Sequence, residues 1–475
     1  MTLKPLSRSR LTRPALLCLS ACVLAVGSAQ ANLIDDIPAG TGYAALDLCT
    51  RTMQSGDDYL KVRWNYVVPK VQPLPAVWLV NYKAGVKVDV QSYVPFITHK
   101  RTAIFRQGLG CTIVPPGISE SSVRAQAFRA VATPASSTQA WPLGDGPVES
   151  HLSSPEQARL LASHGDAIFA ETTTQANQKQ NTIAFLVARD GHLIYERYAK
   201  GYQRQQAQLG WSMTKSLTAM LAGAMATDQR LSLDAPVGLP QWSGSPKAAI
   251  TWRQLLNMAP GLAWDEGYEG ASDATEMLFS QGNEGQWAAD RPLTSTPGTV
   301  FTYSTGFANV AMWRMRQILG GSHQALYDYY QQRLFAPLGI TGGVIEPDAS
   351  GTPVGGARGV LRPVDWLRLG QLVAQGGVWR GQTLIDPPTM DFLLAPSPAS
   401  AEYGGMIWRQ PAQAIPAELR ARLPGDLVWF AGHMGQYVVI VPSRQVVVAR
   451  MGASFDKPET IRRVFSAVAD LLDQP

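Results

Sequence analysis

The sequence predicts an α+β protein in which an antiparallel sheet is flanked by helices and is joined to a mainly helical subdomain. Two apolar runs, 182–188 and 193–198, surround Arg189-Asp190-Gly191, a combination typical of a β-hairpin. A long stretch with a helical pattern, 212–394, follows and is broken by loops rich in Gly and Pro. Three short apolar runs near the end of the chain predict further strands: 427–431, 437–441 and 446–451.

Helices and a separate N-terminal region complete the prediction. Ser154-Pro155-Glu156 is a helix-start signal for a helix that runs towards residue 170, and 458–472 is expected to form a closing helix. Residues 133–150 are rich in Pro, Ser, Thr and Gly, which indicates a boundary, and 61–68 and 77–82 before it have strand-like patterns. We therefore predict a leader at 1–31, an accessory domain at 32–135, a linker at 136–152 and a main domain at 153–475.

Composition excludes several classes of protein. Of 475 residues, 45% are hydrophobic and only 16% are charged, so the chain can bury a large core and is not a disordered protein. Its 43 glycines and 33 prolines follow no fixed period, which argues against collagen, solenoid and coiled-coil structures. The length suggests about two to three domains.

The N-terminal segment predicts export. A basic stretch ends at Arg13, an apolar run covers 14–27, and Ala29-Gln30-Ala31 follows, as in a cleaved secretory signal peptide. A periplasmic or secreted protein is therefore expected. Leu19-Ser20-Ala21-Cys22 also resembles a lipoprotein cleavage site, but we rank this second, because the apolar run continues past Cys22 where a polar tether would be expected.

Charge gives no sign of a nucleic-acid or membrane partner. The chain has 41 Lys and Arg against 36 Asp and Glu, and four of the basic residues lie in the first 31, so the remainder is nearly neutral. No Lys/Arg cluster provides a footprint for nucleic acid or anionic lipid. No other segment reaches the roughly 18 apolar residues that a membrane helix needs.

Four cysteines and six histidines are informative mainly by their spacing. Cys18 and Cys22 would leave with the leader, so the exported chain would keep Cys49 and Cys111, which are expected to pair in an oxidising compartment. Two buried free thiols are the alternative. No CxxC or HExxH occurs and the histidines are scattered, so neither a metal site nor another cofactor is predicted.

Ser212-Met213-Thr214-Lys215 is the strongest candidate for chemistry. If this segment opens a helix, positions i and i+3 share a face, so the Lys215 amine can lie beside the Ser212 hydroxyl. A serine becomes a nucleophile when a neighbouring base takes its proton, and a lysine is such a base only when burial or nearby positive charge keeps it neutral. The motif alone is weak, because Ser454-Phe455-Asp456-Lys457 has the same spacing; an N-cap serine with a solvated lysine would be the ordinary interpretation.

Two downstream motifs support the first instance. Tyr303-Ser304 follows Pro297-Gly298, and His433-Met434-Gly435 stands before a predicted C-terminal strand. The order SxxK, YS, HxG resembles the serine β-lactamase and penicillin-binding-protein superfamily, on its class C-like esterase and amidase side. Further segments resemble 6-aminohexanoate-dimer hydrolase-like proteins over about 155–475, among them GWSMTKSLT, LLNMAPGLAWDEGY and GHMGQYVVIVPSRQVVVARMG.

The resemblance implies a β-lactamase/transpeptidase-like fold and a role for each matching residue. It implies that Ser212 is the acylated nucleophile, Lys215 its general base, and Tyr303 a second proton handler for the leaving group and for deacylation. The backbone N–H groups of Ser212 and Gln436 would form the oxyanion hole. His433 and Gly435 would belong to the third motif beside the cleft, and Tyr268 matches a tyrosine that closes over substrate; each of Tyr303, His433 and Tyr268 could also be an ordinary structural residue.

Departures from the family pattern bear on the substrate. Class C β-lactamases have an asparagine two places after the tyrosine and a lysine in the third motif, where this chain has Thr305 and His433. Both changes remove polar handles for a β-lactam. We therefore expect an exported serine hydrolase that acts on a small ester or linear amide. The alternatives are a D-Ala-D-Ala peptidase or weak β-lactamase of the same fold, and a non-catalytic binding module; an α/β-hydrolase is disfavoured because no GxSxG occurs.

Overall fold

The computed structural model describes residues 36–93, 98–131, 137–146, 152, 154–410 and 412–474. The predicted leader at 1–31, with the alternative cleavage site at Cys22, lies outside the described residues, and the linker at 136–152 lies partly outside them. Among the described residues no helix is both long enough and apolar enough to cross a membrane.

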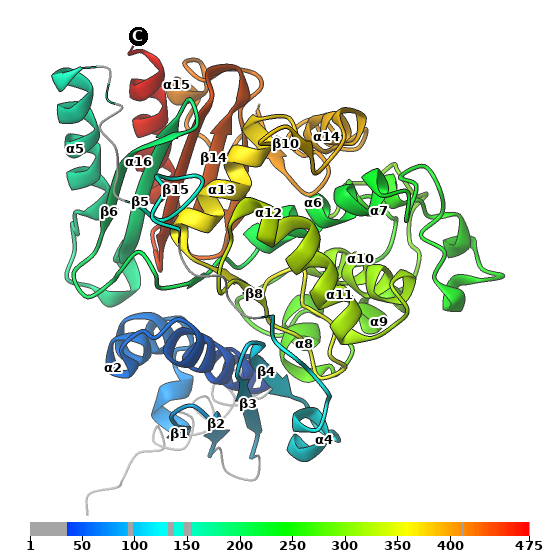
Figure 1. The fold of residues 1–475 in the computed structure, drawn as a ribbon. Coiled ribbons are helices and arrows are strands. Elements are labelled where there is room, and N and C mark those ends of the chain that lie inside the picture. The colour runs from blue at the N-terminus through cyan, green and yellow to red at the C-terminus, as the bar shows by residue number, and fades with distance from the viewer. Residues whose placement is uncertain are drawn as a thin grey trace, which may run out of the picture.

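A six-stranded antiparallel sheet, in the order β12-β13-β14-β15-β5-β6, forms the centre of the main domain (Figure 1). The hairpin predicted around Arg189-Asp190-Gly191 is present, with Asp190 and Gly191 both at positive φ. The three predicted C-terminal strands pair next to it, so strands far apart in sequence share one sheet and the predicted α+β class is confirmed. Bounds are β5 Thr182–Arg189, β6 His192–Tyr198, β12 Trp408–Arg409, β13 Val428–Gly432, β14 Gln436–Val441 and β15 Val446–Gly452.

Both faces of this sheet are covered. Strand β14 is buried along its whole length, with Val438 and Ile440 in one apolar cluster and Val439 in another, because successive side chains of a strand point to opposite faces. Helices α5 (Pro155–Phe169) and α16 (Lys457–Leu472) lie side by side on one face, as the sequence predicts (Figure 1). Helix α13 (Pro363–Ala374) packs on the other face against β14, β15 and β5.

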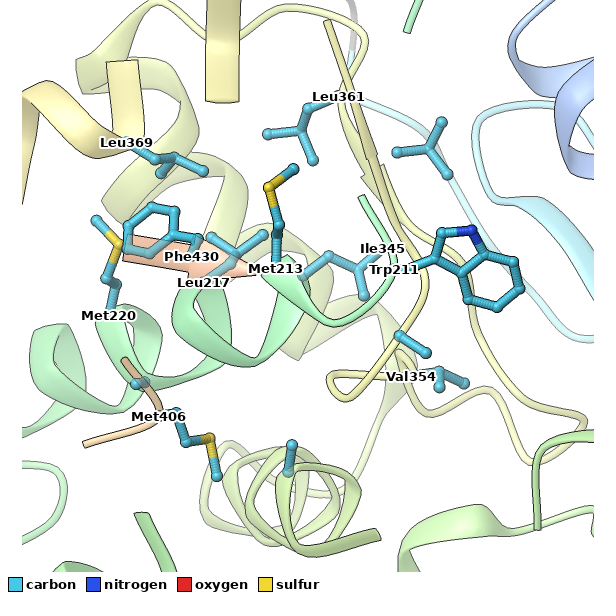
Figure 2. Packing of buried hydrophobic residues seen from close by; sticks show 14 of the residues in the cluster. Trp211, Met213, Leu217, Met220, Ile345, Val354, Leu361, Leu369, Met406 and Phe430 are labelled. Carbon is cyan, nitrogen blue, oxygen red and sulfur yellow. The ribbon is translucent and has the colours of Figure 1, made fainter. Parts of the chain in front are cut away.

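Helices are the main regular elements between β6 and β12. Helix α6 (Met213–Thr227) runs from the sheet into this helical region, and every residue from Met213 to Met225 is buried. Figure 2 shows Leu217 and Met220 of α6 against Phe430 of β13. The remaining helices are α7 Trp252–Leu256, α8 Asp273–Ser280, α9 Glu284–Ala289, α10 Thr305–Ile318, α11 His323–Tyr330, α12 Ala336–Leu338, α14 Pro387–Leu394 and α15 Ala417–Arg420.

Two small strand groups lie outside the main sheet. One has the order β7-β9-β8, with β7 (Gln208–Leu209) ending immediately before the segment that leads into α6. Its partners are β8 (Val344–Ile345) and β9 (Gly359–Leu361), both buried. The other is the hairpin of β10 (Val378–Trp379) and β11 (Gln382–Thr383). The first group anchors the N-terminal end of α6.

The N-terminal region has a helix and its own antiparallel sheet, in the order β1-β2-β3-β4. A helix covers 36–49, and a disulfide joins its last residue, Cys49, to Cys111 of β4, as predicted. Glu346 accepts hydrogen bonds from the Cys111 backbone N–H at 2.6 Å and from Thr50 Oγ1 at 2.7 Å, which ties the disulfide to the main domain. Bounds are β1 Trp78–Lys83, β2 Lys87–Ser92, β3 Lys100–Arg106, β4 Gly110–Val114 and α4 Glu120–Arg124.

The strand predicted at 61–68 is wrong. This segment is helical, comprising α2 (Tyr59–Lys61), the π-helical turn Val62–Val67 and α3 (Val68–Lys70). The side chain of Asp58 caps the start by accepting from the Lys61 N–H. Val62 and Tyr66 are buried four positions apart on one helix face, so tertiary burial outweighed the strand preference of the valines and aromatics.

The N-terminal region and the main domain share one hydrophobic cluster. Tyr43 and Leu46 of helix 36–49 belong to the same buried cluster as Trp211 and Met213. The predicted boundaries at 135 and 152 remain predictions, but the N-terminal helix lies directly against the start of α6.

Candidate active site

Ser212 lies at the N-cap of α6, where the sequence predicts the nucleophile. The segment before it is held by a hydrogen bond from the Gly210 N–H to the Gly359 carbonyl at 2.8 Å and by one from Thr214 Oγ1 to the Trp211 carbonyl at 2.6 Å. Trp211 has φ of 49°, a conformation that a bulky residue rarely adopts and that the surrounding contacts must maintain. Ser212 itself is only half-buried, so its hydroxyl can be reached.

Lys215 lies beside this hydroxyl and is almost completely buried, with 1% of its side chain exposed. Its Nζ is 2.8 Å from Ser212 Oγ, 2.8 Å from Thr305 Oγ1 and 3.0 Å from the carbonyl of Gly356. An ammonium would donate one proton to each oxygen. A neutral amine has two protons, and if these go to Thr305 and Gly356, its lone pair faces the Ser212 hydroxyl.

Tyr303 approaches the same serine from another part of the chain. Its phenol is close enough to Ser212 and to the indole of Trp408 in β12 for both groups to lower its pKa, and its ring lies 4.7 Å from Lys215 Nζ. The tyrosine is half-buried, and its ring packs against Tyr403 and Trp408. Ser212, Lys215 and Tyr303, which are up to 91 positions apart in sequence, therefore meet around one point.

The environments of the lysine and the tyrosine shift their pKa values in opposite directions. Burial lowers the pKa of Lys215 to about 8, although the nearby carboxylate of Glu266 partly opposes this shift. Burial raises the pKa of Tyr303 well above its ordinary value, with Glu266 adding to the effect. At neutral pH Tyr303 is thus a protonated donor, and Lys215 is the group that can lose its proton, a separation typical of acid–base pairs.

Glu266 is a member of this cluster that the sequence analysis missed. Its Oε1 is 3.6 Å from Lys215 Nζ and accepts hydrogen bonds from Tyr268 Oη and Thr305 Oγ1, both at 2.5 Å. Its Oε2 accepts from the Thr305 N–H at 2.7 Å and from Trp264 Nε1 at 2.6 Å. The acidic pair in LAWDEGY, placed between a tryptophan and a tyrosine, is the signal that could have indicated it.

Tyr268, for which the resemblance implies a role in closing over substrate, lies against the cluster. Its hydroxyl bridges Glu266 and Thr305 Oγ1, which is 2.8 Å away, and its ring is 5.9 Å from that of His433. Thr305, at the position where an asparagine would be expected, contacts Lys215, Glu266 and Tyr268 together. The threonine hydroxyl is therefore occupied by neighbours within the site.

The third motif forms the turn between β13 and β14. His433 is half-buried, and its ring lies 5.4 Å from that of Trp211. Burial lowers the pKa of His433 well below neutral pH, and the positive charges of Lys70 and Arg51 add to this effect. The imidazole is therefore uncharged. The motif therefore provides no cation at this side of the site.

Glycines in this turn have a structural reason. Gly435 has φ of 80°, and a Cβ there would lie 2.8 Å from Arg450 Nη1. A Cβ on Gly432 would collide with the carbonyl of Gly210, so the end of β13 touches the segment that precedes the nucleophile. The side chain of Gln436 is bonded to Gly452 through both its oxygen and its nitrogen, which leaves only its backbone for the predicted oxyanion role.

The second SxxK segment has the ordinary structural role. Ser454 Oγ donates to the carbonyl of Gln180 at 2.5 Å and accepts from Arg450 Nη2 at 2.7 Å. Lys457 is exposed at the first position of α16. The two side chains do not form a serine–lysine pair.

The cluster has the parts needed for acyl transfer by a serine: an accessible hydroxyl, a buried amine with a lowered pKa and a phenol that holds its proton. Among the described residues no group of three or more His, Cys, Asp or Glu side chains could hold a metal ion.

Comparisons with known proteins identify the family of the chain. The profile of the Beta-lactamase family matches residues 167–471, which include Ser212, Lys215, Glu266, Tyr268, Tyr303 and His433. A curated relative, the 6-aminohexanoate-dimer hydrolase of Paenarthrobacter ureafaciens, is 26% identical over 230 residues. That match covers 45% of this chain and 57% of the relative, so the chain spans little more than half the relative's length.

Solved structures show the same fold. A Bacillus anthracis protein assigned as a 6-aminohexanoate-dimer hydrolase has a TM-score of 0.53 at 18% identity, covering 90% of this chain and 97% of its own. EstCE1, described as a hydrolase with promiscuous acyltransferase activity, has a TM-score of 0.51 at 18% identity, covering 66% of this chain and 99% of its own.

Proposed function

The chain belongs to the Beta-lactamase family of serine hydrolases, and from this we propose that it cleaves an ester or a linear amide through an acyl-enzyme on Ser212. The observation that carries the proposal is the meeting of Ser212, Lys215 and Tyr303 within hydrogen-bonding or ring contact. The name of the dimer hydrolase agrees with a linear amide substrate, and the acyltransferase activity in the description of EstCE1 agrees with an acyl-enzyme.

Each residue would have one task in acylation. Ser212 Oγ attacks the carbonyl carbon while its proton passes to Lys215 Nζ, and the carbonyl oxygen becomes an oxyanion beside the backbone N–H groups of Ser212 and Gln436. Collapse of this intermediate breaks the bond to the leaving group, which takes the Tyr303 proton. The extra proton on Lys215 then restores the phenol. In deacylation, water attacks the carbonyl carbon of the acyl-enzyme and gives up a proton to Lys215 and Tyr303. The bond from this carbon to Ser212 Oγ then breaks, the acid product leaves, and Ser212 Oγ regains its hydrogen from the same pair.

Uncharged substrates fit this site better than β-lactams or D-Ala-D-Ala peptides. Both of those carry a carboxylate, which a cation in the third motif would pair with, whereas His433 is neutral. Thr305 is occupied by Lys215 and Glu266. We therefore expect little turnover of a chromogenic cephalosporin, and stable labelling by a fluorescent penicillin would instead favour the peptidase.

The test measures how fast each variant hydrolyses p-nitrophenyl acetate. It also measures covalent labelling by a fluorophosphonate probe as a mass gain in intact-mass spectrometry. Ser212→Ala should lose turnover and the mass gain. Ser454→Ala is the matched control from the other SxxK segment, and it should keep turnover and labelling even if it melts earlier. Parent-like hydrolysis by Ser212→Ala would refute the nucleophile, and a parent protein with neither turnover nor labelling would indicate a binding module.

We also propose that the protein is exported to the periplasm or secreted. The N-terminal segment and the Cys49–Cys111 disulfide support this, because disulfides persist mainly in oxidising compartments. The expected result is a mature N-terminus after Ala31 in the periplasmic or culture fraction. Recovery of an acylated Cys22 would favour a lipoprotein, and full-length protein in the cytoplasm would refute export.

A further inference from the structure

A cavity of about 170 Å³ lies between the N-terminal region and the main domain, next to the candidate active site. We propose that this cavity binds the acyl chain of the substrate and that it selects short apolar chains or an aromatic ring. The inference rests on the proposed ester or amide hydrolase activity. The apolar lining of the cavity comes from both regions: Ile37, Ala39 and Leu74 belong to the N-terminal region, and Trp211, Leu278 and Phe279 belong to the main domain.

Two residues that line the cavity are neighbours of the candidate catalytic residues. Trp211, which lines it, immediately precedes Ser212. Tyr268, which also lines it, has its hydroxyl 2.8 Å from Thr305 Oγ1, and that oxygen is in turn 2.8 Å from Lys215 Nζ. The wall of the cavity therefore includes the residue that precedes the nucleophile and a tyrosine that contacts the cluster around Lys215.

The location of the cavity indicates that it receives the acyl group of the substrate and not the leaving group. The leaving group departs towards its proton donor, Tyr303, whose ring packs with Tyr403 and Trp408. None of these three side chains lines the cavity, whereas Trp211 and His433 do. The substituent on the other side of the scissile carbonyl is the acyl chain, so that is the group that can enter.

The N-terminal wall is held in place by several contacts. Tyr43 of helix 36–49 stacks on Trp211 with ring centroids 5.7 Å apart and an interplanar angle of 5°. Lys70 pairs with Glu269 at 2.8 Å, and the Ala271 N–H donates to Asp36 at 2.8 Å, which fastens both ends of the wall to the loop after Tyr268. Figure 1 shows this region as a separate blue layer next to the helical part of the main domain.

Size and polarity define the ligand class. Three charged groups line the cavity: Lys70 and Glu269 pair with each other, and Asp36 accepts a hydrogen bond from the Ala271 N–H. The rest of the lining is mainly apolar and aromatic. A cavity of about 150 Å³ lined by apolar side chains is large enough for benzene. A four-carbon chain or a phenyl ring therefore fits.

The first experiment varies the acyl chain at a constant leaving group. The parent should prefer p-nitrophenyl butyrate to p-nitrophenyl acetate by about fifteenfold in kcat/KM, which corresponds to burying two methylene groups. Ala39→Trp fills the cavity and should bring the ratio near one, whereas Ala162→Trp, at an exposed alanine of α5, should keep the parent ratio. If Ala39→Trp does not fold, Leu278→Ala enlarges the cavity and should shift the optimum to a longer acyl chain.

A second arm varies the alcohol of alkyl acetates. Ala39→Trp should leave the butyl-to-ethyl ratio unchanged. If Ala39→Trp changes the butyl-to-ethyl ratio and leaves the butyrate-to-acetate ratio unchanged, the cavity holds the leaving group and the proposal is wrong. An unchanged butyrate-to-acetate ratio in both Ala39→Trp and Leu278→Ala would also overturn it.

Binding without turnover separates this proposal from the proposed function. Toluene should raise the melting temperature of Ser212→Ala, because a ligand that binds only the folded state stabilises it, and the effect should vanish when Ala39→Trp is added. Loss of toluene binding with esterase activity intact refutes only the cavity, and toluene binding by a protein without esterase activity refutes only the hydrolase.

Discussion

Replacing Glu266 by glutamine should move the pH dependence of hydrolysis to lower pH. Lys215 must be neutral to accept the Ser212 proton, so the acid limb of kcat/KM should follow its titration, with a midpoint in the parent near its pKa of about 8. The Glu266 carboxylate opposes the effect of burial by favouring the ammonium form. Its removal should lower the pKa of Lys215 further and keep the amine neutral to a lower pH.

The distance sets the magnitude. The two groups are 3.6 Å apart, at which unit charges interact by about 1 kcal/mol in water and by about 5 kcal/mol at an effective dielectric constant of 20. At about 1.4 kcal/mol per pKa unit, the midpoint should fall by roughly one to three pH units. The plateau should also fall, because a less basic amine is a weaker proton acceptor and the ammonium formed in the reaction loses its partner.

Glutamine preserves the shape of the side chain, and its carbonyl can still accept from the Thr305 N–H and Trp264 Nε1. The assay is kcat/KM for p-nitrophenyl acetate between about pH 5 and pH 10. Glu276→Gln, at an exposed glutamate of α8, is the matched control and should keep the parent profile. If the midpoint of Glu266→Gln equals that of the parent, Lys215 is not the group that titrates in the acid limb, and the assignment of the base fails.

Three further predictions concern the surrounding structure. Tyr303→Phe keeps the ring but removes the proton donor, so kcat should fall by about 10² to 10⁴ with KM little changed, and a fall of less than about threefold would exclude acid–base catalysis by this residue. Replacing Cys49 and Cys111 by serine opens a crosslink across 62 positions and should reduce the free energy of unfolding by about 4 kcal/mol in urea denaturation; an unchanged midpoint and slope would contradict this. Gly432→Ala should lower both the melting temperature and kcat/KM, the latter by about a hundredfold, because its methyl group would displace the Gly210 carbonyl next to the nucleophile. Parent-like activity of that variant would mean that this segment can shift freely.

Local patterns in the sequence were sufficient for much of the fold. The hairpin at 182–198, the three C-terminal strands and the helices that cover them depend on hydrophobic periodicity and on turn residues such as Asp190 and Gly191, which act within a few positions of each other. The SxxK spacing is also local, since positions i and i+3 share a helix face wherever the helix lies. That is why Ser212 and Lys215 could be paired before the structure was known, and why the spacing alone could not separate them from Ser454 and Lys457.

Long-range packing decided the rest. Whether a lysine serves as a base depends on burial. Lys215 is buried among segments distant in sequence, which contribute Glu266, Thr305 and Gly356, whereas Lys457 is exposed. Glu266 contributes through four hydrogen bonds whose geometry no periodicity encodes. The helix at 61–68 and the cavity walled by helix 36–49 likewise exist only because separate parts of the chain pack together. Sequence spacing determines which groups share a local element, but the distances and burial that control reactivity are properties of the assembled core.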